Sequence, residues 1–333
     1  MSVHFSRSYL GILGLILCLQ TQVMAAPLKV GLVLDKGGKD DKSFNASAFR
    51  GVSEAQKKLG ITLKTVESSD DASVEASLRT FAQRGFDLVI GIGFVMVEPI
   101  TKVAKDFPKI KFVIIDAIGQ GPNVCSLSFK EQEGSYLVGA LAALTSKTKT
   151  VGFIGGMDVP LIRRFEKGYR AGIKKIDPSI KVLVNYVGST SEAWRDPTKG
   201  KELAVSQYLR KADVIFSPAG ASALGVFDAA EEAKKLVIGT DSNQNGVKPG
   251  RVLTSMMKNL DSAVYDTIEK TINGKFQPGA QQLGLKEGAV DFAMDSNNRP
   301  LIPPAVLTRI NKLKQEIIEG KIKVPDYYEE AKS

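Results

Sequence analysis

The chain has 333 residues, and its composition excludes several kinds of catalytic site. It contains one histidine, His4, and two cysteines, Cys18 and Cys125. If the first 25 residues are removed, the chain keeps no histidine and a single cysteine, Cys125. It then forms no histidine-based catalytic triad, no internal disulfide and no ordinary zinc, copper or haem site. The formal net charge is +9, but the lysines are spread along the chain without interleaved aromatic residues. We therefore expect no nucleic-acid partner and no cofactor.

The first 25 residues resemble a cleavable export signal. Arg7 supplies a positive charge, residues 10–19 are almost wholly apolar, and small residues precede a cleavage site between Ala25 and Ala26. We expect a periplasmic protein that begins at Ala26.

Two alternatives remain for this segment. One is an uncleaved anchor, although the apolar run is shorter than the roughly 20 residues of a membrane span. The other is a lipoprotein attached through Cys18, although the residue before it, Leu17, is larger than lipoprotein processing prefers.

Apolar strands alternate with amphipathic helices from Leu28 onward. This pattern predicts a parallel sheet that is covered by helices on both faces. The predicted strands are 28–34, 61–66, 88–92 and 112–115, and the predicted helices are 46–59, 73–84 and 98–107.

The second half of the chain repeats the first. Segment 29–33 resembles 150–154, segment 84–90 resembles 210–216, and segment 111–116 resembles 235–241, in the same order and at a nearly constant interval. About 308 mature residues also exceed the usual size of one core. The sequence therefore predicts an α/β protein of two doubly wound lobes with one cleft between them.

We expect three crossings between the lobes, near 128–130, 254–255 and 278, which would form a three-strand hinge. The first lobe would comprise residues 26–127 and 256–278. The second would comprise 128–255 and 279–333, with a C-terminal helix at 304–319.

Carboxylates follow three predicted strands at equivalent ends. Asp35 follows the first strand, while Asp116 and Asp241 follow corresponding strands of the two lobes. Carboxyl ends of parallel strands meet at one edge, so we expect these side chains to accept hydrogen bonds from ligand hydroxyl or N–H groups. Capping of the following helices is the alternative.

The loop 37–45 lacks the order of a phosphate-binding loop. Its informative residues are Phe44, which can stack on a planar ligand, and Asn45, whose amide can both donate and accept. A hydrophobic staple followed by an Asn cap is the alternative. We interpret Asp40 and Asp41 as a solvated loop.

Three further residues follow strands or lie in polar loops. Trp194, the only tryptophan, lies in the irregular stretch 188–200 and could cover the second face of a ring, or pack against its own loop. Lys258 could donate to a ligand hydroxyl, or lie in solvent. Gly220 would allow close approach of the backbone.

Motifs distributed along most of the chain carry a family resemblance. They are 43–45, 112–116, 129–137, 151–157, 194–200, 238–241 and 254–258. Together they resemble the basic membrane protein family of substrate-binding proteins, and within it the purine nucleoside receptors. The resemblance covers about 28–325, and one departure is Asn243, where the family often has Asp.

The resemblance implies the type I periplasmic-binding fold and a role in an ABC importer. It implies that Phe44 stacks on a purine, with Trp194 as a second aromatic residue, and that Asn45 and Asp116 read the base edge. It further implies that the ribose is held by Asp35, Asp241, Lys258 and the backbone of Gly220.

We therefore expect a ligand receptor rather than an enzyme, with a purine nucleoside and an inner-membrane ABC permease as partners. The same fold could instead bind another planar or sugar-like ligand, or signal closure to a membrane sensor. A nucleoside hydrolase that uses the carboxylates, with or without Ca²⁺, is the enzymatic alternative.

Overall fold

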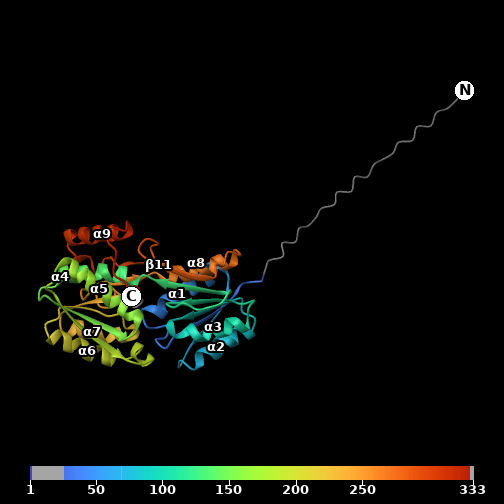
Figure 1. Cartoon of the computed structure of the whole chain (residues 1–333), viewed down its shortest axis with the longest axis horizontal. Helices are drawn as coiled ribbons and strands as arrows, with labels where there is room; N and C mark the ends of the chain where they lie inside the picture. Colours follow the sequence, from blue (N-terminus) through green and yellow to red (C-terminus); the bar gives the residue numbers. More distant parts are fainter. Residues whose placement is uncertain (2–25, 69, 331–333) are drawn as a thin grey trace.

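The computed structural model describes Met1, residues 26–68 and residues 70–330. The predicted export signal, including Cys18, lies outside the described residues. From residue 26 the chain folds into two lobes side by side, each built around one sheet (Figure 1).

The first sheet has the strand order β11-β5-β4-β3-β1-β2, and each neighbouring pair is parallel. Helices α1 and α8 lie on one face and α2 and α3 on the other (Figure 1). Every residue of β3 is buried, as expected for a strand covered on both faces. The elements are β1 (Lys29–Leu34), α1 (Phe44–Leu59), β2 (Thr62–Glu67), α2 (Ser73–Gln83), β3 (Leu88–Ile92), α3 (Val97–Asp106), β4 (Lys111–Ile115), β5 (Val124–Phe129), α8 (Leu260–Ile272) and β11 (Gly279–Leu283).

The second sheet has the order β12-β10-β9-β8-β6-β7, in which only the edge strand β12 is antiparallel to its neighbour. Helices α4 and α5 pack together on one side, and α6 and α7 pack together on the other (Figure 1). The elements are α4 (Glu131–Thr145), β6 (Thr150–Met157), α5 (Pro160–Ile176), β7 (Lys181–Gly188), α6 (Pro197–Leu209), β8 (Val214–Phe216), α7 (Ala223–Glu232), β9 (Leu236–Asp241), β10 (Val252–Lys258) and β12 (Val290–Phe292).

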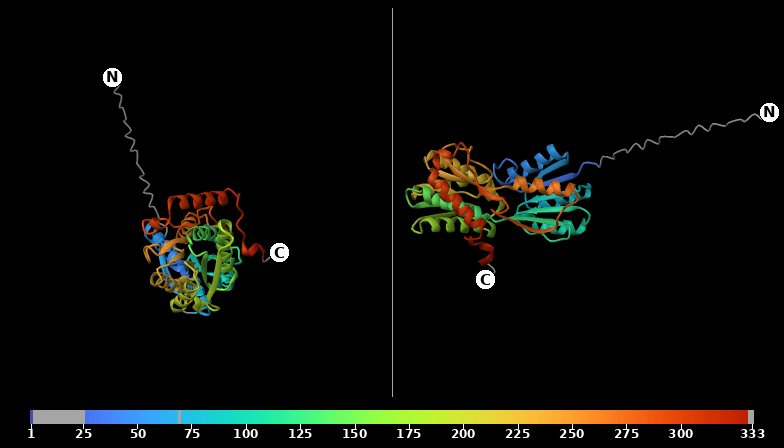
Figure 2. Two further views of the ribbon diagram at one scale, coloured as in Figure 1. Left: turned by 90° about the vertical axis from the view of Figure 1, so that its left-hand side faces the viewer. Right: turned by 90° about the horizontal axis from the view of Figure 1, so that it is seen from above.

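Two C-terminal helices complete the second lobe. Helix α9 (Pro304–Ile318) lies across this lobe (Figure 2) and buries Ile310, Leu313 and Ile317, while α10 (Tyr327–Glu330) packs against α5. The predicted α/β class with two doubly wound lobes is thus confirmed.

The chain passes between the two sheets three times, after Phe129, after Lys258 and after Leu283. The predicted positions of the last two crossings, 254–255 and 278, are a few residues too early. Strand β10 continues to pair with β9 and β12 as far as Lys258. Residues 279–283 belong to the first sheet, because β11 pairs with β5 along its whole length.

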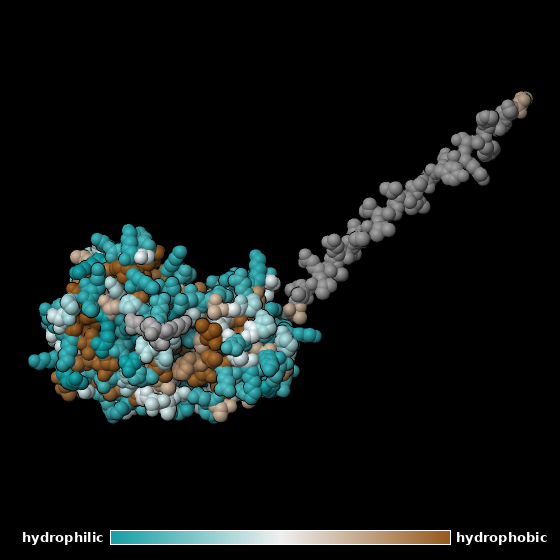
Figure 3. Space-filling model, in the orientation of Figure 1, coloured by the Kyte–Doolittle hydropathy of each residue, from teal (hydrophilic) through white to brown (hydrophobic). Residues whose placement is uncertain are grey.

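Hydrophilic side chains cover most of the face shown in Figure 3, and hydrophobic ones form smaller patches, one of them beside the junction of the two lobes. Within the part of the chain that the structure describes, every helix is too short or too polar to cross a lipid bilayer.

Candidate functional site

The carboxyl ends of both sheets face one cavity between the lobes. All eight residues predicted for the site line it, and with its opening it encloses about 540 Å³ of empty space. Its predicted lining residues are Asp35, Phe44, Asn45, Asp116, Trp194, Gly220, Asp241 and Lys258.

Asp35 is held at the end of β1 by the start of α1. Its Oδ1 accepts from the Gly37 N–H at 2.9 Å and from Asn45 Nδ2 at 2.7 Å. Burial raises the pKa of Asp35 to about 6, although these two hydrogen bonds lower it. The carboxyl group therefore titrates near neutral pH while facing the cavity.

Asp41 is the residue that caps α1. Its buried carboxylate accepts backbone N–H groups of Ser43, Asn45 and Ala46 at 2.8, 2.9 and 3.0 Å. The interpretation of this residue as part of a solvated loop is wrong, because its carboxylate satisfies N–H groups that the first turn of a helix leaves without partners.

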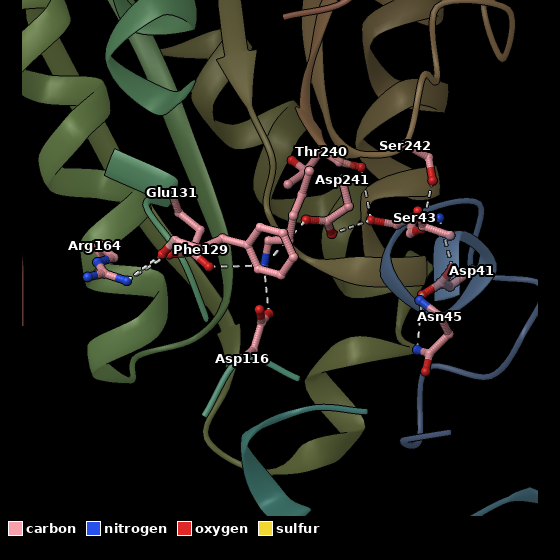
Figure 4. A network of polar contacts seen from close by, with 12 residues as sticks. Asp41, Ser43, Asn45, Asp116, Phe129, Glu131, Arg164, Thr240, Asp241 and Ser242 are labelled. Atoms are coloured by element: carbon pink, nitrogen blue, oxygen red, sulfur yellow. Dashed lines mark hydrogen bonds and ion pairs between the residues drawn. The ribbon is translucent and has the colours of Figure 1, made fainter. Parts of the chain in front are cut away.

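Asn45 lies in the first turn of α1 and not at its cap. Its Nδ2 donates to both Asp35 and Asp41, at 2.7 and 3.1 Å, and its Oδ1 accepts from the Asp35 N–H at 3.3 Å. Both amide protons are therefore used within the protein, and Figure 4 shows the contact with Asp41. The amide oxygen alone keeps a free lone pair for a ligand.

Asp116 and Asp241 occupy corresponding positions at the ends of β4 and β9. Each has a φ of 66°, a left-handed conformation that Asp tolerates better than most residues. Each is buried, and Oδ1 of each has no hydrogen-bond partner. Burial raises the pKa of Asp116 to about 7, opposed by the positive charge of Lys258 and reinforced by Glu131.

Lys258, the last residue of β10, is buried at the centre of these carboxylates. Its Nζ lies 2.6 Å from Asp116 Oδ2, 3.1 Å from Glu131 Oε1 and 4.0 Å from Asp241 Oδ1. Burial lowers the pKa of Lys258, but the carboxylates outweigh this and hold the pKa above its ordinary value. The alternative of a solvated lysine is therefore wrong.

Aromatic rings surround the same ammonium group. Lys258 Nζ lies 5.1 Å from the ring centre of Phe44, 5.2 Å from that of Phe129 and 5.4 Å from that of Phe165. These are cation–π distances. The face of Phe44 is thus placed next to the charged centre of the cavity.

Trp194 forms another part of the cavity wall. Its indole lies directly over Gly156, where a Cβ would overlap the ring, and Phe94 contacts it edge-on with ring centres 6.5 Å apart. Gly220 has a φ of +56°, and a Cβ added at this residue would lie 3.1 Å from the Trp194 carbonyl oxygen. Glycine is required at both positions for Trp194 to line the cleft.

Sequence reasoning missed two important residues. Phe94 lines the cavity two positions after the end of β3, and this place near a strand end was the available signal. Glu131 is fully buried beside Lys258 at the start of α4. It was missed because an acidic residue in a first helical turn is usually solvated.

Direct contacts join the two lobes on both sides of the cavity. Ser43 Oγ donates to Asp241 Oδ2 at 2.8 Å, and Ser242 Oγ donates to the Ser43 carbonyl at 2.7 Å (Figure 4). Elsewhere, Ser191 Oγ donates to Asp71 at 2.7 Å, and Lys36 pairs with Glu192. These contacts hold the lobes together over the cleft.

Comparisons with known proteins agree with this architecture. Residues 28–327 match the family described as ABC transporter substrate-binding protein PnrA-like. The chain is 38% identical over 321 residues to the ABC transporter nucleoside-binding protein BmpA of Lactococcus lactis, which covers 90% of this chain and 89% of that protein. It is 37% identical over 320 residues to a CD4+ T-cell-stimulating antigen of Listeria innocua, covering 89% and 88%.

A crystal structure of an ABC transporter solute-binding protein from Aeropyrum pernix K1 superimposes with a TM-score of 0.83 and 29% identity, covering 90% of this chain and 94% of that one. The lobes, the interlobe cavity and the match over 28–327 lead to one conclusion: the chain belongs to the PnrA-like, basic membrane protein family of ABC transporter substrate-binding proteins.

Proposed function

We propose that the interlobe cavity binds a purine nucleoside, which the protein delivers to an ABC permease of the inner membrane. The observation that carries this proposal is the combination of aromatic rings with buried carboxylate oxygens that lack a partner. A purine supplies a flat surface for Phe44 and Trp194. Its N–H groups supply donors for Asp116, and the ribose supplies hydroxyl donors for Asp241.

The relative from Lactococcus lactis, named as nucleoside-binding, supports the same ligand class. In this proposal Asn45 serves mainly to hold Asp35, since both its amide protons are already donated. Its predicted contact with the base edge is then restricted to accepting one hydrogen bond through Oδ1.

Calorimetry of residues 26–333 tests the ligand class, after unfolding and refolding to remove any ligand bound during expression. Inosine, guanosine and adenosine are compared with ribose and with free hypoxanthine. We expect micromolar or tighter binding of at least one nucleoside, and much weaker binding of ribose or base alone. The absence of heat with all three nucleosides would overturn the proposal.

A matched pair of variants tests the stacking. Phe44→Leu keeps apolar bulk in the cavity but removes the ring, and Phe49→Leu makes the same change on α1 outside the cavity lining. Because base–aromatic stacking contributes about 1–3 kcal/mol, we expect Phe44→Leu to weaken binding by roughly 5- to 150-fold. Equal affinities of the two variants would contradict the role of Phe44.

The proposed role is binding without chemistry. The cavity carboxylates lie around Lys258, which neutralises part of their charge. Incubation of the protein with inosine, followed by chromatography for hypoxanthine, should yield no free base. Release of hypoxanthine that depends on Asp116 or Asp241 would instead establish a hydrolase.

We also propose that the protein is exported and cleaved between Ala25 and Ala26. The intact mass of the protein isolated from its native membrane and periplasmic fractions tests this directly. A mass equal to residues 26–333 supports the proposal. A mass that includes Cys18 with attached acyl chains would show a lipoprotein.

A further inference from the structure

A row of charged side chains connects the C-terminal segment to the cavity. Asp326 forms a two-point ion pair with Arg164, through Nε at 2.8 Å and Nη2 at 2.5 Å. Arg164 Nη1 lies 3.0 Å from Glu131 Oε2, and Glu131 Oε1 lies 3.1 Å from Lys258 Nζ. Lys258 then reaches Asp116 at 2.6 Å.

The members of this row come from five separate segments of the chain. Asp326 directly precedes α10, Arg164 lies on α5, Glu131 opens α4, Lys258 ends β10 and Asp116 follows β4. All five are at least nine-tenths buried. Only Asp116 belongs to the first lobe, so the last ion pair of the row spans the cleft.

Arg164 has a fixed orientation. Besides its two carboxylate partners, Nη1 donates to the Phe129 carbonyl at 2.6 Å, and the ring of Tyr328 lies 4.7 Å from the guanidinium carbon. A planar guanidinium bound on several sides keeps its neighbours in one geometry. Glu131 is therefore held by Arg164 through Oε2 (Figure 4), and this leaves Oε1 directed at Lys258.

We propose that Arg164 and Asp326 are positioning residues for ligand binding, which hold Glu131 so that it shares Lys258 with Asp116. This inference rests on the proposed function only for the identity of the ligand. The C-terminal segment lines an adjoining second cavity, which shares Phe94, Asp116 and Leu161 with the ligand cavity. This segment, which does not line the ligand cavity itself, then determines how strongly the cleft binds.

The two positioning residues have opposite charges, and this gives a signature that a purely structural role lacks. Asp326→Asn removes a negative charge and frees Arg164 to stabilise the other carboxylates, so the titration of Asp116 moves to lower pH. Arg164→Gln removes the positive charge, so the titration moves to higher pH. The charged and titratable groups that act on Asp116 are Lys258, Glu131, Asp241 and the Tyr328 phenol.

The test uses residues 26–333 without ligand, labelled with ¹³C at aspartate carboxyl carbons. Carbon-13 NMR between pH 5 and 9 follows each titration, and the Asp116 signal is assigned by its absence in Asp116→Asn. We expect Asp326→Asn and Arg164→Gln to shift the Asp116 midpoint in opposite directions. Shifts in the same direction, or midpoints equal to that of the unmodified protein, would overturn the proposal.

Matched controls separate positioning from general damage. Arg163→Gln alters the adjacent residue of α5, whose partners Asp158 and Glu166 lie outside the row, and Glu329→Gln alters the same C-terminal segment. Both should leave the midpoint unchanged. Asp326→Glu should give the same Asp116 midpoint as the unmodified protein, because it keeps the negative charge at this position. If Arg164→Gln does not fold, the comparison of Asp326→Asn with Asp326→Glu still tests the proposal.

Inosine affinity supplies the second readout. At pH 9, where Asp116 is ionised in each variant, we expect Asp326→Asn to weaken it by on the order of tenfold, as when a partner that orients a ligand-binding side chain is removed, and Asp326→Glu to recover it. If the unmodified protein binds no nucleoside, the proposed function fails, but the NMR titrations still decide the role of Arg164 and Asp326. Unchanged inosine affinity in Asp326→Asn would contradict a role in binding.

Discussion

Asp116 and Asp241 occupy the same position in the two lobes, share a φ of 66°, and each direct one oxygen without a hydrogen-bond partner into the interlobe region. They face Lys258 at 2.6 and 4.0 Å. Corresponding strand ends of the two lobes, those of β4 and β9, have thus placed one carboxylate on each side of a single buried cation. These two carboxylate oxygens lack hydrogen-bond donors within the protein, and a ligand with hydroxyl or N–H groups would supply them.

The first prediction concerns pH and stability without ligand. The pKa of Asp116 is raised by burial from 3.8 to about 7, so its contribution to stability is present at low pH and lost as pH rises through 7. We expect the free energy of unfolding in urea to fall between pH 5.5 and 8. In Asp116→Asn that fall should be much smaller, and an equally steep fall would contradict the assignment.

Ligand affinity should have the opposite dependence on pH. A hydroxyl or N–H group donates to a carboxylate but not to the protonated oxygen of a carboxylic acid. Nucleoside binding should therefore strengthen as pH rises through the pKa values of Asp35, about 6, and Asp116, about 7. Calorimetry across this range measures it. No histidine contributes, because the only one, His4, precedes the proposed cleavage site.

The second prediction concerns the buried lysine. Lys258→Met leaves several carboxylates without their cation, and breaking a buried pair in this way costs about 3–5 kcal/mol. We expect a large loss of stability above pH 7, with partial recovery at pH 5.5 as the carboxylates take up protons. Thermal and urea unfolding at both pH values provide the measurement.

Lys248→Met is the matched control, because Lys248 also pairs with two carboxylates, Asp228 and Glu231, but at the surface. Exposed pairs contribute about 0–1 kcal/mol. Similar losses in the two variants would show that the cluster around Lys258 is not electrostatically distinctive.

The third prediction concerns the packing of Trp194 against Gly156. In Gly156→Ala the new Cβ overlaps the indole of Trp194, so the ring must move out of the cavity wall. We expect a changed fluorescence spectrum from the sole tryptophan, a loss of about 1–3 kcal/mol in stability and weaker nucleoside binding. Gly246→Ala, whose Cβ meets only Asn297 Nδ2 at 3.7 Å, should change none of these. An unaltered spectrum in Gly156→Ala would refute this placement of Trp194.

The fourth prediction concerns the contacts across the cleft. Lys36 in the first lobe pairs with Glu192 in the second, beside the hydrogen bond from Ser191 to Asp71. Because closure brings these groups together, Glu192→Gln should speed ligand release by less than about tenfold, as expected for an exposed pair. High salt should reduce the difference from the unmodified protein.

Stopped-flow displacement of bound nucleoside at low and high salt measures this rate. Glu202→Gln is the control, because Glu202 pairs with Lys199 within one helix of the second lobe. If Glu202→Gln speeds release as much as Glu192→Gln does, the pair across the cleft has no special role in closure.

Much of the fold follows from patterns that physical chemistry makes strong. Buried parallel strands such as Leu88–Ile92 are continuously apolar, so their prediction is secure. The edge strand β11, with the sequence GAQQL, was not predicted because it is mostly exposed and carries no apolar signal. The site residues at strand ends could be predicted because the carboxyl ends of parallel strands lie at the same edge of a sheet.

Other parts of the site depend on contacts between segments distant in sequence. The burial of Glu131 depends on Arg164 and Lys258, which lie 33 and 127 positions further along the chain. Similarly, the capping role of Asp41 depends on how its loop turns back over α1. No local pattern distinguishes such residues from solvated acids.

The three crossings between the lobes have a mechanical consequence. The first crossing runs from Phe129, whose carbonyl binds Arg164, to Glu131, and the second begins immediately after Lys258. Any rotation of one lobe against the other therefore stretches or compresses the distances between these charges. The hinge and the buried charges are thus formed by the same few residues. A ligand that changes the angle between the lobes must also change the electrostatic interactions among these charges, and the reverse also holds.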